Sequence, residues 1–273
     1  MDHILLNKII IDISDSEYKS TFINNADASV ASKLLAYSEG LYHFADSLYI
    51  TDTVQGLNKF CGRGYPTAAF CHPHNSGEDF GNARYIIEQP EMISLRDYDN
   101  IFRRLYGYPL DILETDRLII RETVVSDTDR FYALYDDPMV ASFMEPLFPP
   151  DEEREYQQSY IDNVYGFSDI GIWTVILKET DEIIGRIGIE YTDDEGCLEL
   201  GFMIGAPYRR RDLAYEACTA IIEYARAIEN ADRIRARVRQ DNDASKGLCA
   251  KLGLTPVKEL PENLTEWSLT LKD

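Results

Sequence analysis

Residues 198–217 of this chain read LELGFMIGAPYRRRDLAYEA. The apolar run at 198–204 predicts a strand, and the basic turn at 209–211 leads into a helix whose apolar residues recur at intervals of three and four as far as Ile228. The backbone N–H groups at such a helix start are free, and the positive end of the helix dipole lies beside them. The pattern suits an anion such as a pyrophosphate, but an ordinary structural helix start explains it equally well.

Strand and helix patterns also lie on both sides of this stretch. We expect strands at 115–122, 172–178, 183–191 and 233–239, two further strands near the C-terminus, and helices at 128–135, 151–165 and 243–252. In 233–239 arginine alternates strictly with Ile, Ala and Val, as in a strand with one buried face. The segment 110–273 therefore predicts an α/β domain.

The segment 1–109 shows a second alternation of strands and helices. We expect strands near 4–13, 48–52, 67–71 and 84–88, and helices at 29–40, 54–61 and 94–106. This spacing predicts a small Rossmann-like α/β domain with a parallel sheet. The Tyr-Gly-Tyr-Pro sequence at 106–109 breaks the pattern and is a plausible linker, so we expect two domains, 1–109 and 110–273.

Residues 208–217 resemble the cofactor-binding motif of the GNAT superfamily of N-acetyltransferases. In that motif Arg or Gln, two variable residues, Gly, any residue, and then Gly or Ala open the main helix, and Arg209 and Ala214 match it. Asn242, Ser245 and the sequence KLGL at 251–254 resemble the second signature of the family. Residues 115–122 resemble the first strand of the branch that contains ribosomal-protein N-terminal acetyltransferases.

The resemblance covers residues 110–273 and implies the GNAT fold, a mixed and largely antiparallel sheet flanked by helices. It also implies acetyl-CoA as co-substrate, with the pantetheine arm bound by strand backbone and Asn242 near the thiol. Asn242 could equally be a helix N-cap, and for Ser245 a local structural role is the simpler interpretation. The implied cofactor-binding residues are Phe202, Met203, Ile204, Arg209, Arg210, Arg211, Asp212, Leu213, Ala214, Asn242 and Ser245.

The turn departs from the family pattern at two positions. Asp212 stands where the family has glycine, and Arg210 stands where an earlier glycine is often found. Glycine lets the backbone approach phosphates closely, whereas an aspartate brings negative charge and, as an N-cap, would occupy the amides that a pyrophosphate uses. We expect weakened binding of the cofactor, partly offset by the neighbouring arginines.

Enzymes of this family transfer the acetyl group by direct attack of a neutral amine on the thioester. Since a lysine-like amine has a pKa near about 10.4, a general base is useful at neutral pH. The C-terminal segment has no histidine, so we expect Glu199 to be the base and Glu190 to be the second choice; alternatively, both face solvent. At the position of the general-acid tyrosine of many relatives stands Cys249, which is either a proton donor or, more simply, a small buried side chain.

The net charge of −21 favours a cationic acceptor and disfavours nucleic acid, although acidity also serves solubility alone. The acceptor would be an amine-bearing small molecule or a protein N-terminus. By family resemblance its pocket lies in the loop and helix after the first strand, where carboxylates and aromatics suit a cation. The candidate substrate-binding residues are Asp136, Asp137, Phe143 and Glu145.

Several features argue against other classes of protein. The chain has neither a run of about 20 apolar residues nor a signal-peptide pattern, so we expect a cytoplasmic protein without membrane contact. Its five cysteines include no CxxC pair, and Cys71-His72-Pro73-His74 has poor ligand spacing, so we expect no metal.

The segment 1–109 resembles the later half of a haloacid dehalogenase-like domain, in a degenerate or truncated form. Asp12-Ile13-Ser14-Asp15 lacks the spacing of the Asp-x-Asp nucleophile loop, so a binding or dimerising module is expected, with a homodimer as one outcome. Two alternatives to an active acetyltransferase remain. One is a non-catalytic acyl-CoA sensor, and the other is a bifunctional protein with residual phosphatase activity that depends on Asp12.

Overall fold

The computed structural model describes residues 4–38, 46–81, 83–168, 170–228 and 230–272. The chain divides into two compact units, Met1–Leu110 and Asp111–Asp273. Among the described residues, no helix has both the length and the apolar character that crossing a membrane requires.

The first unit, as far as it is described, contains a five-stranded parallel sheet in the order β2-β1-β3-β4-β5. The chain passes from β1 to its neighbour on one side and then to its neighbour on the other, so the topological switch point lies between β1 and β3. Ile9, Leu48 and Phe102 are fully buried in its core. The elements are β1 (Lys8–Asp12), α1 (Ser16–Asn25), α2 (Ala28–Ala31), β2 (Leu34–Ala36), β3 (Ser47–Thr51), α3 (Val54–Cys61), β4 (Thr67–Phe70), β5 (Ile86–Ile87) and α4 (Leu95–Tyr106), with 3₁₀ turns at Pro73–Asn75 and Pro90–Met92.

The expected helix at 29–40 is wrong. The helix α2 ends at Ala31, and β2 then pairs in parallel with β1, with Leu35 opposite Ile10. This pairing with a distant strand overrides the local preference for helix. Residues 39 and 40 lie outside the described residues. The helix α1 was not expected, although Asp15 caps it by accepting hydrogen bonds from the amides of Glu17 and Tyr18.

The second unit contains, within the described residues, an eight-stranded sheet in the order β12-β13-β11-β10-β9-β8-β7-β6. All neighbouring strands are antiparallel except β10 and β11. The strands are β6 (Asp111–Glu114), β7 (Leu118–Arg121), β8 (Gly171–Leu177), β9 (Glu182–Tyr191), β10 (Cys197–Ile204), β11 (Arg233–Arg239), β12 (Thr255–Leu260) and β13 (Leu264–Thr270). The helices are α5 (Thr128–Tyr135), α6 (Pro138–Phe143), α7 (Pro150–Tyr160), α8 (Leu213–Arg226) and α9 (Asp243–Lys251), with a π-helical turn at Ile161–Tyr165 and 3₁₀ turns at Val125–Asp127 and Ala206–Tyr208.

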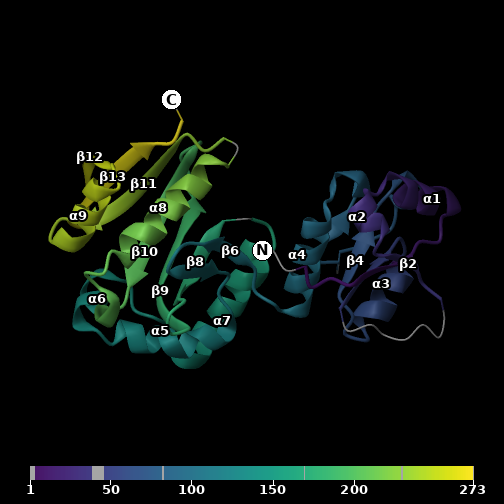
Figure 1. Ribbon diagram of the computed structural model, residues 1–273, viewed down its shortest axis with the longest axis horizontal. Coiled ribbons are helices and arrows are strands. Elements are labelled where there is room, and N and C mark those ends of the chain that lie inside the picture. Colours follow the sequence, from purple (N-terminus) through teal and green to yellow (C-terminus); the bar gives the residue numbers. More distant parts are fainter. Residues whose placement is uncertain (1–3, 39–45, 82, 169, 229, 273) are drawn as a thin grey trace. The chain divides into compact units, whose positions relative to one another are not determined.

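Helices cover both faces of this sheet. Figure 1 shows α8 alongside β10 and β11, and its buried residues share one core cluster with Leu198 and Leu200 of β10. Met203 belongs instead to a separate cluster with Phe131 of α5 and Val140 of α6. Because side chains alternate along a strand, even-numbered residues of β10 face α8 and odd-numbered residues face α5 and α6. The expected fold class is confirmed for both units.

Candidate active site

The strands β10 and β11 separate soon after they meet. Their parallel pairing joins residues 197–199 of β10 to residues 233–235 of β11, while β10 continues against β9 as far as Ile204 and β11 continues against β13. Beyond Glu199, therefore, the edge of β10 that faces β11 has no strand partner among the described residues. Its N–H and C=O groups are available to a ligand with amide groups.

The N-terminus of α8 is uncapped. Asp212 occupies the N-cap position, but its side chain makes no capping hydrogen bond, and the amides of Leu213, Ala214 and Tyr215 have no partner among the described residues. Free amides at the start of a 14-residue helix form a site for an anionic group. The expectation that the Asp212 carboxylate blocks these amides is wrong.

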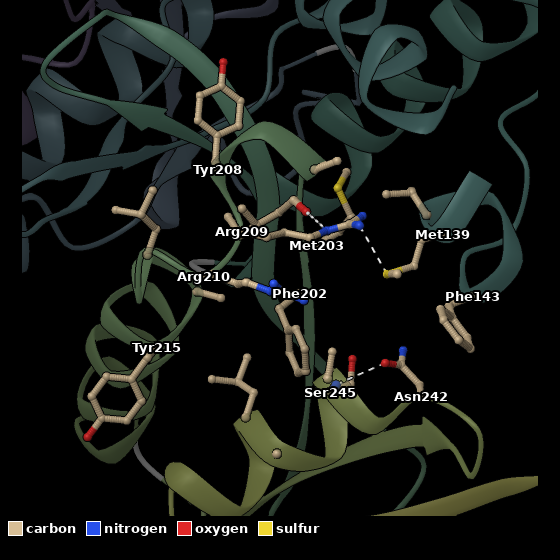
Figure 2. Close-up of a pocket in the computed structure, with 18 of the residues that line it drawn as sticks. Met139, Phe143, Phe202, Met203, Tyr208, Arg209, Arg210, Tyr215, Asn242 and Ser245 are labelled. Atoms are coloured by element: carbon tan, nitrogen blue, oxygen red, sulfur yellow. Dashed lines mark hydrogen bonds between the residues drawn. The ribbon is translucent and has the colours of Figure 1, made fainter. Parts of the chain in front are cut away.

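A cavity of about 650 Å³ lies between these two features. Figure 2 shows Phe202 and Ser245 facing the same space, with Phe143 on its far side and the ring of Tyr215 turned away. The lining comes from β10, the following turn, the first turn of α8, α9 and α6. It consists of Met139, Val140, Phe143, Met144, Phe202, Met203, Ile204, Ala206, Tyr208, Arg209, Arg210, Asp212, Leu213, Ala214, Tyr215, Asn242, Ala244, Ser245, Gly247, Leu248 and Lys251.

The three arginines of the turn have different partners. Arg209 turns toward α6, where a nitrogen of its guanidinium group lies 2.9 Å from Oδ1 of Asp137. Arg211 points to Glu179 and does not line the cavity. Arg210 lines the cavity and forms no ion pair with any described residue, so its guanidinium group is available to an anion.

Asp212 pairs with a residue of α9. The Nζ of Lys251 donates to its Oδ1 at 2.7 Å, and this hydrogen bond and the lysine charge lower the pKa of Asp212. Lys251 also lies over the ring of Tyr215, 4.2 Å from its centroid. Both Arg210 and Asp212 have the left-handed backbone conformation, with φ of 59° and 58°. These are the two positions at which the family pattern has glycine, which adopts this conformation without strain.

Asn242 and Ser245 lie together at the start of α9. The Oδ1 of Asn242 accepts a hydrogen bond from the amide of Ser245 at 3.0 Å, so Asn242 is the N-cap of α9. Both residues also line the cavity, and the cap is therefore compatible with contact to a ligand.

Comparison with known proteins agrees with this geometry. Residues 117–255 match the family model described as an acetyltransferase (GNAT) domain. The chain belongs to the GNAT acetyltransferase family. The predicted enzyme class, an N-acetyltransferase, is confirmed at this level.

Several known proteins are similar to about half of this chain. The uncharacterized N-acetyltransferase p20 of Bacillus licheniformis is 30% identical over 139 residues, which are 50% of this chain and 78% of p20. A putative ribosomal-protein-serine acetyltransferase from Vibrio cholerae matches with a TM-score of 0.51 and 20% identity over 57% of this chain and 95% of its own. Spermidine N-acetyltransferase from Vibrio cholerae, solved with CoA and spermine, matches with a TM-score of 0.50 and 18% identity over 57% and 97%. At these identities the two structures support the fold alone.

In the GNAT unit, Glu199 does not line the cavity. It occupies the last paired position before β10 and β11 separate, on the face opposite α8, with 22% of its side chain exposed. Its two carboxylate oxygens accept hydrogen bonds from Arg235 at 3.1 Å and Arg237 at 2.7 Å. The hydrogen bond that Arg237 donates to Glu199 raises the pKa of Arg237. Both oxygens of Glu199 are thus occupied by guanidinium groups.

Glu190, the second candidate base, is exposed at the position of β9 opposite Glu199. Its Oε1 accepts a hydrogen bond from the hydroxyl of Tyr160 at 3.0 Å. That hydroxyl also accepts from the amide of Ile172 at 2.8 Å, and burial raises the pKa of Tyr160. Glu190 does not line the cavity either.

The four candidate acceptor residues are not brought together. Only Phe143 lines the cavity, with the guanidinium group of Arg239 5.7 Å from its ring centroid. Asp137 caps α6 and pairs with Arg209. Asp136 and Glu145 are exposed and do not line the cavity. A sequence pattern places carboxylates in this loop, but it does not say which way they point.

Cys249 is fully buried, and burial raises the pKa of its thiol to about 12. It does not line the cavity, so its role is that of a small packed side chain. Sequence reasoning missed two lining residues that carry chemistry. Lys251 belongs to the second signature, and Met139 follows the candidate Asp137 by two positions, but nothing in the sequence indicated the contacts of either residue.

Proposed function

We propose that the GNAT unit binds acetyl-CoA in the cavity between the open edge of β10 and the start of α8, and transfers its acetyl group to a primary amine. The observation that carries this proposal is the uncapped start of α8, whose free amides and unpaired Arg210 adjoin the cavity. The amides suit the pyrophosphate, and the open edge of β10 suits the amide groups of the pantetheine arm. GNAT enzymes use acetyl-CoA, so the donor follows from the family, and the binding residues proposed are those of the motif.

The cofactor contacts are proposed residue by residue. The backbone of Phe202, Met203 and Ile204 would bind the pantetheine arm, and Asn242 and Ser245 would lie near the thiol. The pyrophosphate would meet the amides of Leu213 and Ala214 together with Arg210. Arg209, Arg211 and Asp212 would act through the shape and charge of the turn, because their side chains are paired elsewhere.

We propose Glu199 as the general base. It lies on the sheet face that α8 does not cover, at the point where the two strands part, and odd-numbered residues of β10 share that face with Met203 of the cavity lining. To accept a proton from the amine, directly or through a water, its carboxylate must release one guanidinium partner. Glu190 is the second candidate because it lies opposite Glu199 in β9.

The acceptor we propose is a cationic amine, either a small molecule or a peptide N-terminus. The charge of −21 would draw such a molecule toward the protein. One structural relative acts on spermidine, and the name of another refers to a ribosomal protein, so both kinds of acceptor occur within this fold. Phe143 would contact the acceptor, while Asp136, Asp137 and Glu145 would act through their charge.

A non-catalytic acyl-CoA sensor is the second candidate. Two observations favour it: Asp212 places a carboxylate beside the phosphate site, and the position of the general-acid tyrosine is occupied by a buried cysteine. For the first unit, residues 1–109, we propose a degenerate haloacid dehalogenase-like module that binds a ligand or a second copy of the chain, as in a homodimer. In that unit the loops after β1, β3 and β4 form a cavity of about 450 Å³. Asp12 does not line it, which argues against residual phosphatase activity.

The experiment that tests the function is release of free CoA from acetyl-CoA in the presence of an amine panel. Spermidine and a lysine-containing peptide should raise the rate well above hydrolysis without amine, and neutral amines should be slower. Binding of acetyl-CoA without amine-dependent CoA release would favour the sensor. A neutral amine that reacts as fast as spermidine would contradict the cationic acceptor.

A further inference from the structure

Three aromatic rings form a row on the GNAT unit, on α7 and in the loop before it. The ring centroids of Phe148 and Tyr156 lie 5.4 Å apart, and those of Tyr156 and Tyr160 lie 6.3 Å apart. Tyr156 and Tyr160 are four positions apart in α7, which places them on one face of the helix. Phe148 and Tyr156 are 50% and 47% exposed, so a ligand can reach both rings.

One end of the row lies at the proposed reaction centre. The hydroxyl of Tyr160 donates to Oε1 of Glu190 at 3.0 Å and accepts from the amide of Ile172 at 2.8 Å, which holds the ring in place. Glu190 is paired directly with Glu199 across β9 and β10, so both carboxylates lie on the sheet face that α8 does not cover. The row therefore adjoins the two carboxylates that are proposed to take the proton from the amine.

The other end of the row is held rigidly and adjoins a carboxylate. The amide of Phe148 donates to Glu153 at 3.1 Å, and the carbonyl of Phe148 accepts from the hydroxyl of Tyr132, so the backbone is fixed on both sides of the ring. Glu152 precedes Tyr156 by four positions and lies on the same face of α7. Glu152 is exposed and forms no ion pair with a described residue.

This combination of rings and carboxylate suits a cation. The face of an aromatic ring carries partial negative charge and attracts an ammonium group, and a neighbouring carboxylate adds to the attraction. Among the described residues, no lysine or arginine lies over the ring of Phe148 or Tyr156. The two rings and Glu152 are therefore available to a cation that comes from outside the chain.

We propose that Phe148, Tyr156 and Glu152 form a subsite for a second ammonium group of the acceptor. The acceptor is then a linear diamine or polyamine, whose reacting amine lies at Glu199 while its aliphatic chain crosses the ring of Tyr160. A helix rises about 1.5 Å per residue, so Glu152 lies about 12 Å from Tyr160 along the axis of α7, and only a long chain spans the row. The inference rests on the proposed acetyl transfer and adds the spacing of the two amines.

Calorimetric titration of the full-length protein in the presence of CoA tests the subsite without turnover. The ligands, at matched ionic strength, are octamethylenediamine, n-octylamine and trimethylenediamine. The first two share a chain and differ in the distal group, and the amines of the third lie closer together than the 6.3 Å between the rings of Tyr156 and Tyr160. Octamethylenediamine should bind saturably and at least about fivefold more tightly than either of the others.

Substitutions assign this preference to the row. Tyr156→Leu should weaken binding of octamethylenediamine about two- to fivefold without affecting n-octylamine, and Tyr156→Phe, which keeps the ring, should bind as wild type. Glu152→Gln should also weaken binding of the diamine about two- to fivefold. Tyr191→Leu is the matched control, because Tyr191 is 68% exposed but, as the residue after Glu190, points to the opposite face of the sheet.

No binding of octamethylenediamine, equal affinity for n-octylamine, or unchanged binding of the diamine by Tyr156→Leu would each overturn the subsite. Release of CoA from acetyl-CoA, measured with the same amines, tests the transfer itself. Amine-dependent release that shows no preference for the long diamine would contradict the subsite alone. Binding of the long diamine that depends on Tyr156, without any release of CoA, would support the subsite and contradict the proposed transfer.

Discussion

The Nζ of Lys251 lies 2.7 Å from Oδ1 of Asp212, which ties the last turn of α9 to the residue that precedes α8. Both residues line the cavity of the GNAT unit. The carboxylate that replaces the glycine of the family pattern is therefore drawn away from the helix amides and toward a lysine. Neither charge is lost from the site, so a phosphate group arriving there would meet the repulsion of Asp212 and the attraction of Lys251 together.

The Asp212→Gly substitution should tighten acetyl-CoA binding about five- to tenfold. It removes about 1 kcal/mol of like-charge repulsion near the surface and frees Lys251 for the phosphates. The φ of 58° at this position suits glycine, so the fold should not suffer. Asp212→Asn is the matched control, because asparagine tolerates this backbone and also lacks the charge. Unchanged dissociation constants in both variants, measured by calorimetry, would show that the account of the turn is wrong.

The Glu199→Gln substitution should lower kcat at neutral pH by about 100-fold, the lower end of what a general base contributes. The KM for acetyl-CoA should stay close to wild type, because Glu199 does not line the cavity. Glutamine keeps one oxygen for the guanidinium groups of Arg235 and Arg237, so folding should be preserved. Glu190→Gln serves as the comparison. A larger loss of turnover in Glu190→Gln than in Glu199→Gln would exchange the roles of the two residues.

Cys249 should resist alkylation in the native protein at pH 8. Burial raises the pKa of its thiol to about 12, so almost no thiolate, the reactive form, exists at that pH. Cys61 is exposed in the same chain and provides an internal control. Mass spectrometry after treatment with iodoacetamide should find Cys61 modified and Cys249 unmodified until denaturant is added. Rapid native labelling of Cys249 would contradict the burial on which its packing role rests.

The Asp52→Asn substitution should destabilise the first unit by about 1–3 kcal/mol, because two partly buried amide donors, those of Ser14 and Asp15, lose a charged acceptor. The folded-state pKa of Asp52 is lowered, so its contribution is fully present above the unfolded value of about 3.9 and is lost as pH falls through the lower folded value. The wild-type advantage over the variant should therefore shrink below about pH 4. Histidine ring signals during urea unfolding measure it, and an advantage that persists unchanged at pH 2 would contradict this linkage.

Local patterns predicted the elements that lie close together in sequence. The strand, turn and helix at 198–217 were predicted because the change from alternation to three- and four-residue spacing is visible within one stretch. The short strand β2 was missed because Leu34–Ala36 becomes a strand only through its pairing with β1. Propensity over three residues cannot reveal such a partner.

The sequence predicted which residues belong to the site, but it predicted few of the contacts between their side chains. The cavity lining includes ten of the eleven predicted cofactor-binding residues, and the exception is Arg211. Arg209 lines the wall, but its guanidinium group is paired with Asp137. The alternation in 233–239 predicted an exposed row of arginines, but their pairing with Glu199 depends on the parallel register of β10 and β11. Likewise, the contact of Lys251 with Asp212 joins residues 39 positions apart and has no local signal.

The central claim, that the uncapped start of α8 and the cavity beside it bind acetyl-CoA, is tested most directly by calorimetric titration of the folded full-length protein. The account predicts saturable one-to-one binding, weakened about tenfold by Arg210→Ala, which removes the unpaired guanidinium group, and unchanged by Arg96→Ala in the first unit. Absence of binding, or binding that Arg210→Ala leaves unchanged, would contradict it.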